Sequence, residues 1–102
     1  MEAFLIDPFN KTVTRCVYNG TNDHIYELIG CDLFDIARIG DDGDGIFVDD
    51  EGLGKEGQKF FSCQEYPYPL AGKGLVLGCD MEGNSVTPKI TLDELRATIS
   101  WV

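Results

Sequence analysis

The sequence predicts a single α+β domain spanning residues 1–102, with a mainly antiparallel sheet and two short helices. Short β-type runs recur along the chain, separated by turns rich in Gly, Asn and Asp. Two segments, in contrast, carry helix start and stop signals. A hydrophobic content of 43% with 25% charged residues is ordinary for a globular chain, and no linker or repeat divides it.

The first two strands are predicted to form a hairpin. Ala3–Asp7 is a short apolar run, and Thr12–Tyr18 is rich in β-branched residues and alternates with a period of two. The residues between them include Pro8, which is typical of a turn. We therefore expect the two runs to pair.

A short helix is expected between Thr21 and Gly30. Thr21 or Asn22 can cap its N-terminus by accepting hydrogen bonds from free backbone N–H groups. Apolar residues at i, i+3 and i+4 within residues 25–29 form one stripe. Gly30 stands where a helix commonly ends with a left-handed glycine.

The next predicted unit is a second hairpin with many carboxylates. Asp32–Ile39 has an ambiguous period, but its position between a helix stop and a Gly/Asp cluster suggests a strand. Ile46–Val48 is a second β-type run, and Asp44-Gly45 is a strong turn dipeptide. This interpretation places acidic residues at the tip and at the exit of one hairpin.

The following segment is predicted to contain a loop and two strands. Glu51–Gln58 is rich in glycine and reads as a loop, whereas Lys59–Cys63 is a short strand candidate. Tyr66–Pro69 should be extended, because proline disfavours helix at the preceding residue. Lys73–Met81 is the strongest strand signal, and a turn over residues 82–85 follows it.

The C-terminal segment is predicted to form a helix and a docked tail. Thr91 and Glu94 match the capping box, in which each side chain accepts a hydrogen bond from the other residue's backbone N–H. Leu92 and Leu95 then follow at helical spacing. Residues 99–102 are expected to end the chain as a strand or tail.

The charge balance limits the classes of partner. The chain has 18 acidic and 8 basic residues, a net charge of −10 and a pI near 4.2. Such a surface repels phosphates, so we expect neither direct nucleic-acid binding nor binding to an anionic membrane. It suits a protein partner with a basic surface.

Other features of the sequence indicate a cytoplasmic protein without a cofactor or metal. The N-terminus shows no secretory signal, and no apolar run reaches the length of a membrane helix. Four cysteines, with no closely spaced pair, are expected to be reduced and mostly buried, with a disulfide as the alternative: Cys16, Cys31, Cys63 and Cys79.

Six carboxylates of the second hairpin are the predicted partner-binding residues. They are Asp41, Asp42, Asp44, Asp49, Asp50 and Glu51. The EF-hand pattern fails here, because Ile46 and Phe47 stand where an acid and a glycine are required. An irregular calcium site and an ordinary solvated turn stay open as alternatives. The charges are too sparse to mimic a long duplex, so contact with one basic patch is favoured.

No catalytic residue is predicted, and the protein is expected not to be an enzyme. His24 is the only histidine, and Cys63 or Ser62 could reach it only through the tertiary fold. A thiol enzyme therefore stays a minor alternative. The segment 69–74 contains Gly-Lys but lacks the phosphate-loop pattern.

The alternative function is the binding of a small molecule, for example the sequestration of a nucleotide signal. Five residues are expected to line such a pocket, at the seam of a homodimer if one forms: Tyr66, Tyr68, Gly72, Lys73 and Gly74. The glycines also have a structural explanation, because they permit a sharp entry into the following strand.

The order of these features resembles a known family. Residues 25–29, 34–38, 46–52 and 69–78 together are similar to the small DUF3846-type proteins of phages, prophages and their bacterial hosts. The resemblance spans about residues 1–100 and implies a phage- or mobile-element-associated accessory protein in the bacterial cytoplasm. It carries over no catalytic residue. The leading hypothesis is accordingly a small acidic protein that occupies a basic surface on a host protein, such as a defence protein.

Overall fold

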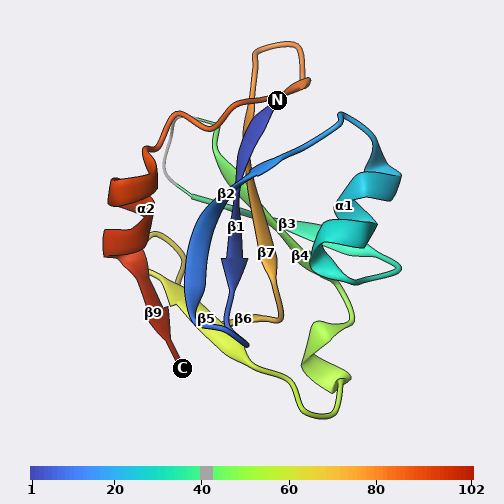
Figure 1. The fold of residues 1–102 in the computed structure, drawn as a ribbon, viewed down its shortest axis with the longest axis vertical. Coiled ribbons are helices and arrows are strands. Elements are labelled where there is room, and N and C mark those ends of the chain that lie inside the picture. Colours follow the sequence, from blue (N-terminus) through green and yellow to red (C-terminus); the bar gives the residue numbers. More distant parts are fainter. Residues whose placement is uncertain (40–42) are drawn as a thin grey trace.

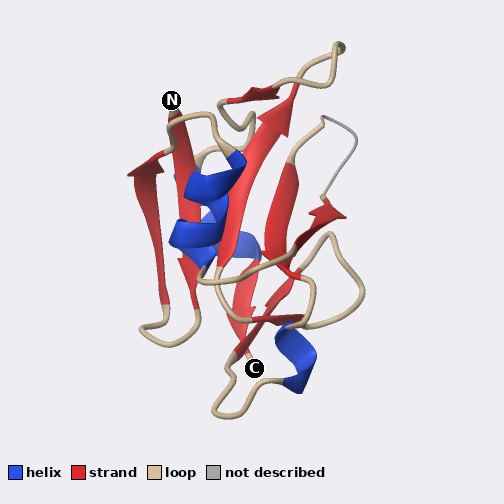
Figure 2. Ribbon diagram, turned by 90° about the vertical axis from the view of Figure 1, so that its right-hand side faces the viewer, coloured by secondary structure: helices blue, strands red, loops and turns tan. Residues whose placement is uncertain are grey.

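The main sheet of the protein is antiparallel throughout and confirms the α+β prediction. The computed structural model describes residues 1–39 and 43–102. In these residues the strand order is β2-β1-β7-β4-β3, and β8 pairs with β7 (Figures 1 and 2). The strands of this sheet are β1 (Glu2–Asp7), β2 (Thr12–Val17), β3 (Phe34–Arg38), β4 (Gly45–Asp49), β7 (Gly74–Cys79) and β8 (Ser85–Val86).

A second, smaller sheet packs against one face of the main sheet. Its order is β6-β5-β9, and its strands are β6 (Leu70–Ala71), β5 (Phe60–Cys63) and β9 (Ile99–Trp101). Helix α2 (Leu92–Thr98) lies on this side, whereas α1 (Asn22–Ile29) covers the opposite face (Figure 1). The chain therefore forms layers on both sides of a central sheet.

Strand β7 divides the hydrophobic core into two parts. Val76 packs with residues of the small sheet and α2, whereas Leu75 and Leu77 pack with α1. This alternation is the period of two of a strand, with both faces buried. The central position of β7 explains why residues 73–81 gave the strongest strand signal.

The predicted hairpin and helix signals are confirmed. Strands β1 and β2 pair antiparallel, from Glu2 with Val17 to Asp7 with Thr12. The Thr21 side chain caps α1 by accepting a hydrogen bond of 3.2 Å from the His24 backbone N–H. Gly30 ends the helix with φ of 69° and donates its backbone N–H to the Tyr26 carbonyl.

Gly74 is a core residue, which differs from its predicted place at a ligand pocket. A Cβ atom built on Gly74 would lie 2.7 Å from Ile46 Cγ2 and 2.9 Å from Phe61 Cζ. The missing side chain therefore leaves room for Phe61 of the small sheet to pack against the main sheet. The sequence also did not predict β6, β8 or a second sheet, because two-residue strands show no recognisable period.

The capping box of α2 gives the first testable prediction. Thr91 Oγ1 accepts from the Glu94 N–H at 3.1 Å, and Glu94 Oε1 accepts from the Thr91 N–H at 3.1 Å. Hydrogen bonds from Thr91 lower the pKa of Glu94. A lowered carboxyl pKa stabilises the fold above the ordinary pKa, and this contribution is lost as the pH falls through the lowered value.

We expect Glu94→Gln to be less stable than the wild type at neutral pH. Glutamine still reaches the Thr91 N–H but carries no charge at the positive end of the helix. The unfolding free energies of the two proteins should converge as the pH falls through the lowered pKa. Urea unfolding at neutral and acidic pH measures this difference. A difference in unfolding free energy that does not change with pH would contradict the stabilising role of the Glu94 charge.

Candidate functional site

The predicted acidic residues lie at both ends of β4 instead of forming one cluster. Asp44 immediately precedes β4, and Asp49 is its last residue. Asp41 and Asp42 lie outside the described residues, so their prediction stands without a structural outcome. The tip and the exit of this hairpin are consequently separated by the length of the strand.

Asp44 is buried and holds the chain together internally. Its side chain is 4% exposed, and its two oxygens accept hydrogen bonds from the backbone N–H groups of Lys89 (2.9 Å) and Ile90 (2.8 Å). The prediction of an exposed Asp44 in a turn was therefore wrong, and Gly45 belongs to β4. This carboxylate ties the β3–β4 hairpin to the segment that enters α2.

Asp49 is also used within the protein. Its side chain is 6% exposed, forms a salt bridge with Lys55 and accepts a hydrogen bond of 2.9 Å from the Glu51 N–H. The hydrogen bond with Asp49 raises the pKa of Lys55. The negative charge of Asp49 is thus partly neutralised by the protein's own lysine.

Asp50 and Glu51 remain exposed at the exit of β4. The Asp50 N–H donates to the Leu33 carbonyl at 3.0 Å, which holds it beside the start of β3. In the β3–β4 pairing, Asp35 lies opposite Val48. The fold therefore brings the exposed Asp35 to the same end of the hairpin as Asp50, although the sequence analysis did not select Asp35.

A shallow groove joins these carboxylates to the two predicted tyrosines. It has a volume of about 280 Å³, and we call it the acidic–aromatic groove. Its lining residues are Asp35, Val48, Asp49, Asp50, Leu53, Tyr66, Tyr68, Pro69, Leu70 and Ala71.

The aromatic wall of this groove is well defined. The rings of Tyr66 and Tyr68 meet edge to face, with centroids 6.2 Å apart. Tyr68 is 68% exposed and Leu53 is 79% exposed, so both present apolar surface next to the acids. The groove combines exposed carboxylates, aromatic rings and an aliphatic side chain.

The residues of the predicted small-molecule pocket do not form one pocket. Tyr66 and Tyr68 line the acidic–aromatic groove, whereas Gly72 and Lys73 line a separate hollow of about 290 Å³ beside Gln58. Gly74 is buried in the core. The five residues thus divide between two hollows and the interior.

The candidate thiol–imidazole pair is not formed. His24 Nδ1 accepts a hydrogen bond of 2.9 Å from the Asn19 N–H, and its ring stacks on Tyr18. Cys63 is buried in the core between the two sheets, whereas Tyr18 belongs to the core beneath α1. His24 and Cys63 therefore belong to opposite sides of the main sheet.

The structure gives no support to a metal site in its described part. Within residues 1–39 and 43–102, no group of three His, Cys, Asp or Glu side chains is placed to hold a metal ion. The irregular calcium alternative included Asp41 and Asp42, which are not described. No described helix is long and apolar enough to cross a membrane.

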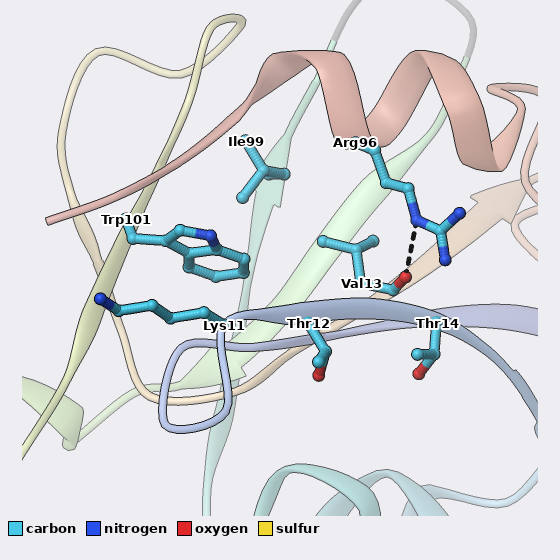
Figure 3. Close-up of a pocket in the computed structure, with 7 residues that line it drawn as sticks. All are labelled: Lys11, Thr12, Val13, Thr14, Arg96, Ile99 and Trp101. Carbon is cyan, nitrogen blue, oxygen red and sulfur yellow. Dashed lines mark hydrogen bonds between the residues drawn. The ribbon is translucent and has the colours of Figure 1, made fainter.

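A third hollow lies between β2 and the C-terminal elements α2 and β9 (Figure 3). It includes Lys11, Arg96 and Trp101, none of which the sequence analysis selected. The sequence carries only a weak signal for this hollow, because its tryptophan stands alone and its two cations are far apart in the sequence. Only the tertiary fold brings these residues together.

Comparison with known proteins places the chain in a family without an assigned activity. The family model "Domain of unknown function (DUF3846)" matches residues 1–98. One relative is "Uncharacterized protein y4iR" of Sinorhizobium fredii (strain NBRC 101917 / NGR234), which is 35% identical over 95 residues.

The alignment with this relative covers 90% of the chain and 58% of the relative, so the chain spans less than two thirds of the relative's length. No solved structure matches. The family match covers nearly the whole chain and agrees with the segment order seen in the sequence, and the chain therefore belongs to the DUF3846 family.

Proposed function

We propose that this protein is a non-enzymatic binding protein that docks a basic surface of a partner protein in the acidic–aromatic groove. The observation that carries the proposal is the placement of exposed Asp35 and Asp50 in one groove with Tyr66 and Tyr68. These groups come from separate parts of the chain. Neither carboxylate takes part in a salt bridge within the described residues.

The chemistry of the groove suits an arginine or lysine side chain. Carboxylates accept charge-assisted hydrogen bonds from both cations, and arginine forms them in pairs. A cation can also lie over a tyrosine ring, which adds attraction when water is excluded. Exposed Leu53 and Tyr68 supply apolar area that a partner would bury.

The net charge of −10 supports the same class of partner. Long-range attraction between an acidic protein and a basic surface mainly raises the association rate and the selectivity. Binding should weaken as salt rises, because the Debye length shortens. Asp44 and Asp49 are not part of the proposed contact, because both are engaged within the protein.

The proposed setting is the bacterial cytoplasm, in association with a phage or mobile element. The resemblance to DUF3846-type proteins of phages and prophages supports this setting, and the relative from Sinorhizobium fredii supports its bacterial part alone. The partner would be a host protein, such as a defence or nucleic-acid-handling protein, whose basic surface becomes occupied. Direct binding of nucleic acid is not proposed.

We expect Asp50→Lys to weaken binding of a fluorescent arginine-rich peptide by about tenfold, which corresponds to the loss of one charge-assisted contact. The matched control is Glu27→Lys, which makes the same charge change at an exposed position on α1. Fluorescence anisotropy at low and moderate salt measures both affinities.

Equal weakening by Asp50→Lys and Glu27→Lys would show that net charge alone attracts the peptide. That result would overturn the groove as the site. Tyr68→Ala, which leaves the charge unchanged, adds an independent measurement, because the proposal requires it also to weaken binding. Circular dichroism of each variant verifies that the fold is kept.

A further inference from the structure

The cleft between β2, α2 and β9 is a second candidate site, on the other side of the protein. Its volume is about 350 Å³, within the usual range of small-molecule sites. Strand β2 lies at one edge of the main sheet, and β3, which carries Asp35, lies at the other. The cleft is therefore independent of the acidic–aromatic groove. Its lining residues are Lys11, Thr12, Val13, Thr14, Arg96, Ile99 and Trp101.

Two cations line this cleft in a protein with only 8 basic residues. Within the described residues, the salt bridges join Arg15 with Glu2 and Lys55 with Asp49, so Lys11 and Arg96 have no acidic partner there. Asp93 lies one helical turn before Arg96 but forms no such bridge with it. Two uncompensated cations in one cleft favour an anionic ligand.

Arg96 is held in place through one nitrogen of its guanidinium. Its Nε donates a hydrogen bond of 3.0 Å to the Val13 carbonyl on β2 (Figure 3). The two terminal amino groups donate no hydrogen bond to the described residues, so they stay available to a ligand. A guanidinium fixed at Nε with free amino groups is well arranged to bind a phosphate.

Trp101 supplies a flat aromatic wall near the other end of the cleft. Figure 3 shows the Lys11 side chain beside the indole ring, with its ammonium group directed away from Arg96. Val13 and Ile99 form an apolar floor between Trp101 and Arg96. A planar ring can stack on the indole, and base–aromatic stacking is worth about 1–3 kcal/mol in other proteins.

We propose that this cleft binds a mononucleotide, with its phosphate paired to Arg96 at one end and its base stacked on Trp101 at the other end, where the Lys11 side chain also lies. A nucleic-acid strand fits less well, because a protein with a net charge of −10 repels its repeating phosphates. A mononucleotide brings at most about two negative charges, which two cations can balance. The proposal goes beyond partner binding and does not depend on it.

The protein reports on this site directly, because Trp101 is its only tryptophan. We expect AMP, GMP, CMP or UMP to cause a saturable change in Trp101 fluorescence, excited at the red edge of the absorption band. The same nucleotide should raise the melting temperature, because a ligand of the native state stabilises it. Adenosine and inorganic phosphate are tested separately and should each bind at least about tenfold more weakly than AMP.

The variant Lys11→Asn tests the cation with little risk to the fold. Lys11 has φ of 56°, a left-handed conformation that asparagine adopts more readily than lysine. We expect the variant to keep its melting temperature and to lose about three- to fivefold in nucleotide affinity, because it removes an attraction to the phosphate that acts across the cleft. Lys73→Asn is the matched control, because Lys73 lines a different hollow and should not affect binding.

Several outcomes would overturn this proposal. One is the absence of a saturable response of the unmodified protein to all four mononucleotides. Binding of adenosine as tight as that of AMP would remove the phosphate contact, and equally tight binding of phosphate would remove the stacking contact. A loss of affinity in Lys73→Asn but not in Lys11→Asn would place the nucleotide in the other hollow.

Discussion

Phe61→Ala is expected to lower the free energy of unfolding by about 3–5 kcal/mol. Phe61 is fully buried on β5 and packs in the core between the two sheets. Its ring occupies the space that Gly74 leaves open on β7. Removing the ring would leave a cavity, because a close-packed core relaxes only partially around a deleted side chain.

This loss is a large fraction of the total stability expected for a domain of this size, which is about 5–15 kcal/mol. Urea unfolding followed by circular dichroism measures the change in unfolding free energy. A low temperature keeps a strongly destabilised variant folded at the start of the titration. Phe9→Ala is the matched control, because Phe9 is about half exposed and should cost under about 1 kcal/mol. If Phe61→Ala lost no more unfolding free energy than Phe9→Ala, the small sheet would contribute little to the core.

Local elements of this fold could be predicted because their signals lie within a few residues. The cap at Thr21, the left-handed Gly30 and the Thr91–Glu94 box each satisfy backbone groups nearby, and each is found in the structure. The β1–β2 hairpin was predictable for the same reason, since a short turn joins its strands.

The division into two sheets could not be predicted in this way. Strand β5 pairs with β9, so that Phe61 lies opposite Trp101 from the far end of the chain. An alternating pattern shows that a strand buries one face, but it does not identify the partner strand. The same limit applied to β6, which is recognisable only by its pairing with β5.

The candidate sites show the limit of sequence reasoning more clearly. Asp44, Asp49 and Asp50 look alike in the sequence, yet the first is buried, the second pairs with Lys55 and the third is exposed. Their roles depend on residues up to 46 positions away along the chain, as for Asp44 and Ile90. A charge cluster in a sequence therefore predicts acidity but not accessibility.

The contrast between these carboxylates leads to the second prediction, for Asp44→Ala. We expect this variant to lose about 2–4 kcal/mol of unfolding free energy, because the backbone N–H groups of Lys89 and Ile90 lose their acceptor. Asp44→Asn should cost less, since an amide oxygen can still accept from one of them. The entry to α2 would loosen first, because these bonds anchor it to the hairpin.

Asp50→Ala is the control for this measurement, because it makes the same substitution at the opposite, exposed end of β4. We expect it to change the unfolding free energy by no more than about 0.5 kcal/mol. Amide hydrogen exchange at Lys89 and Ile90 gives a local readout: protection should fall in Asp44→Ala and stay unchanged in Asp50→Ala. Unchanged protection in Asp44→Ala would show that other contacts hold this segment, and the carboxylate would then be free for a role outside the fold.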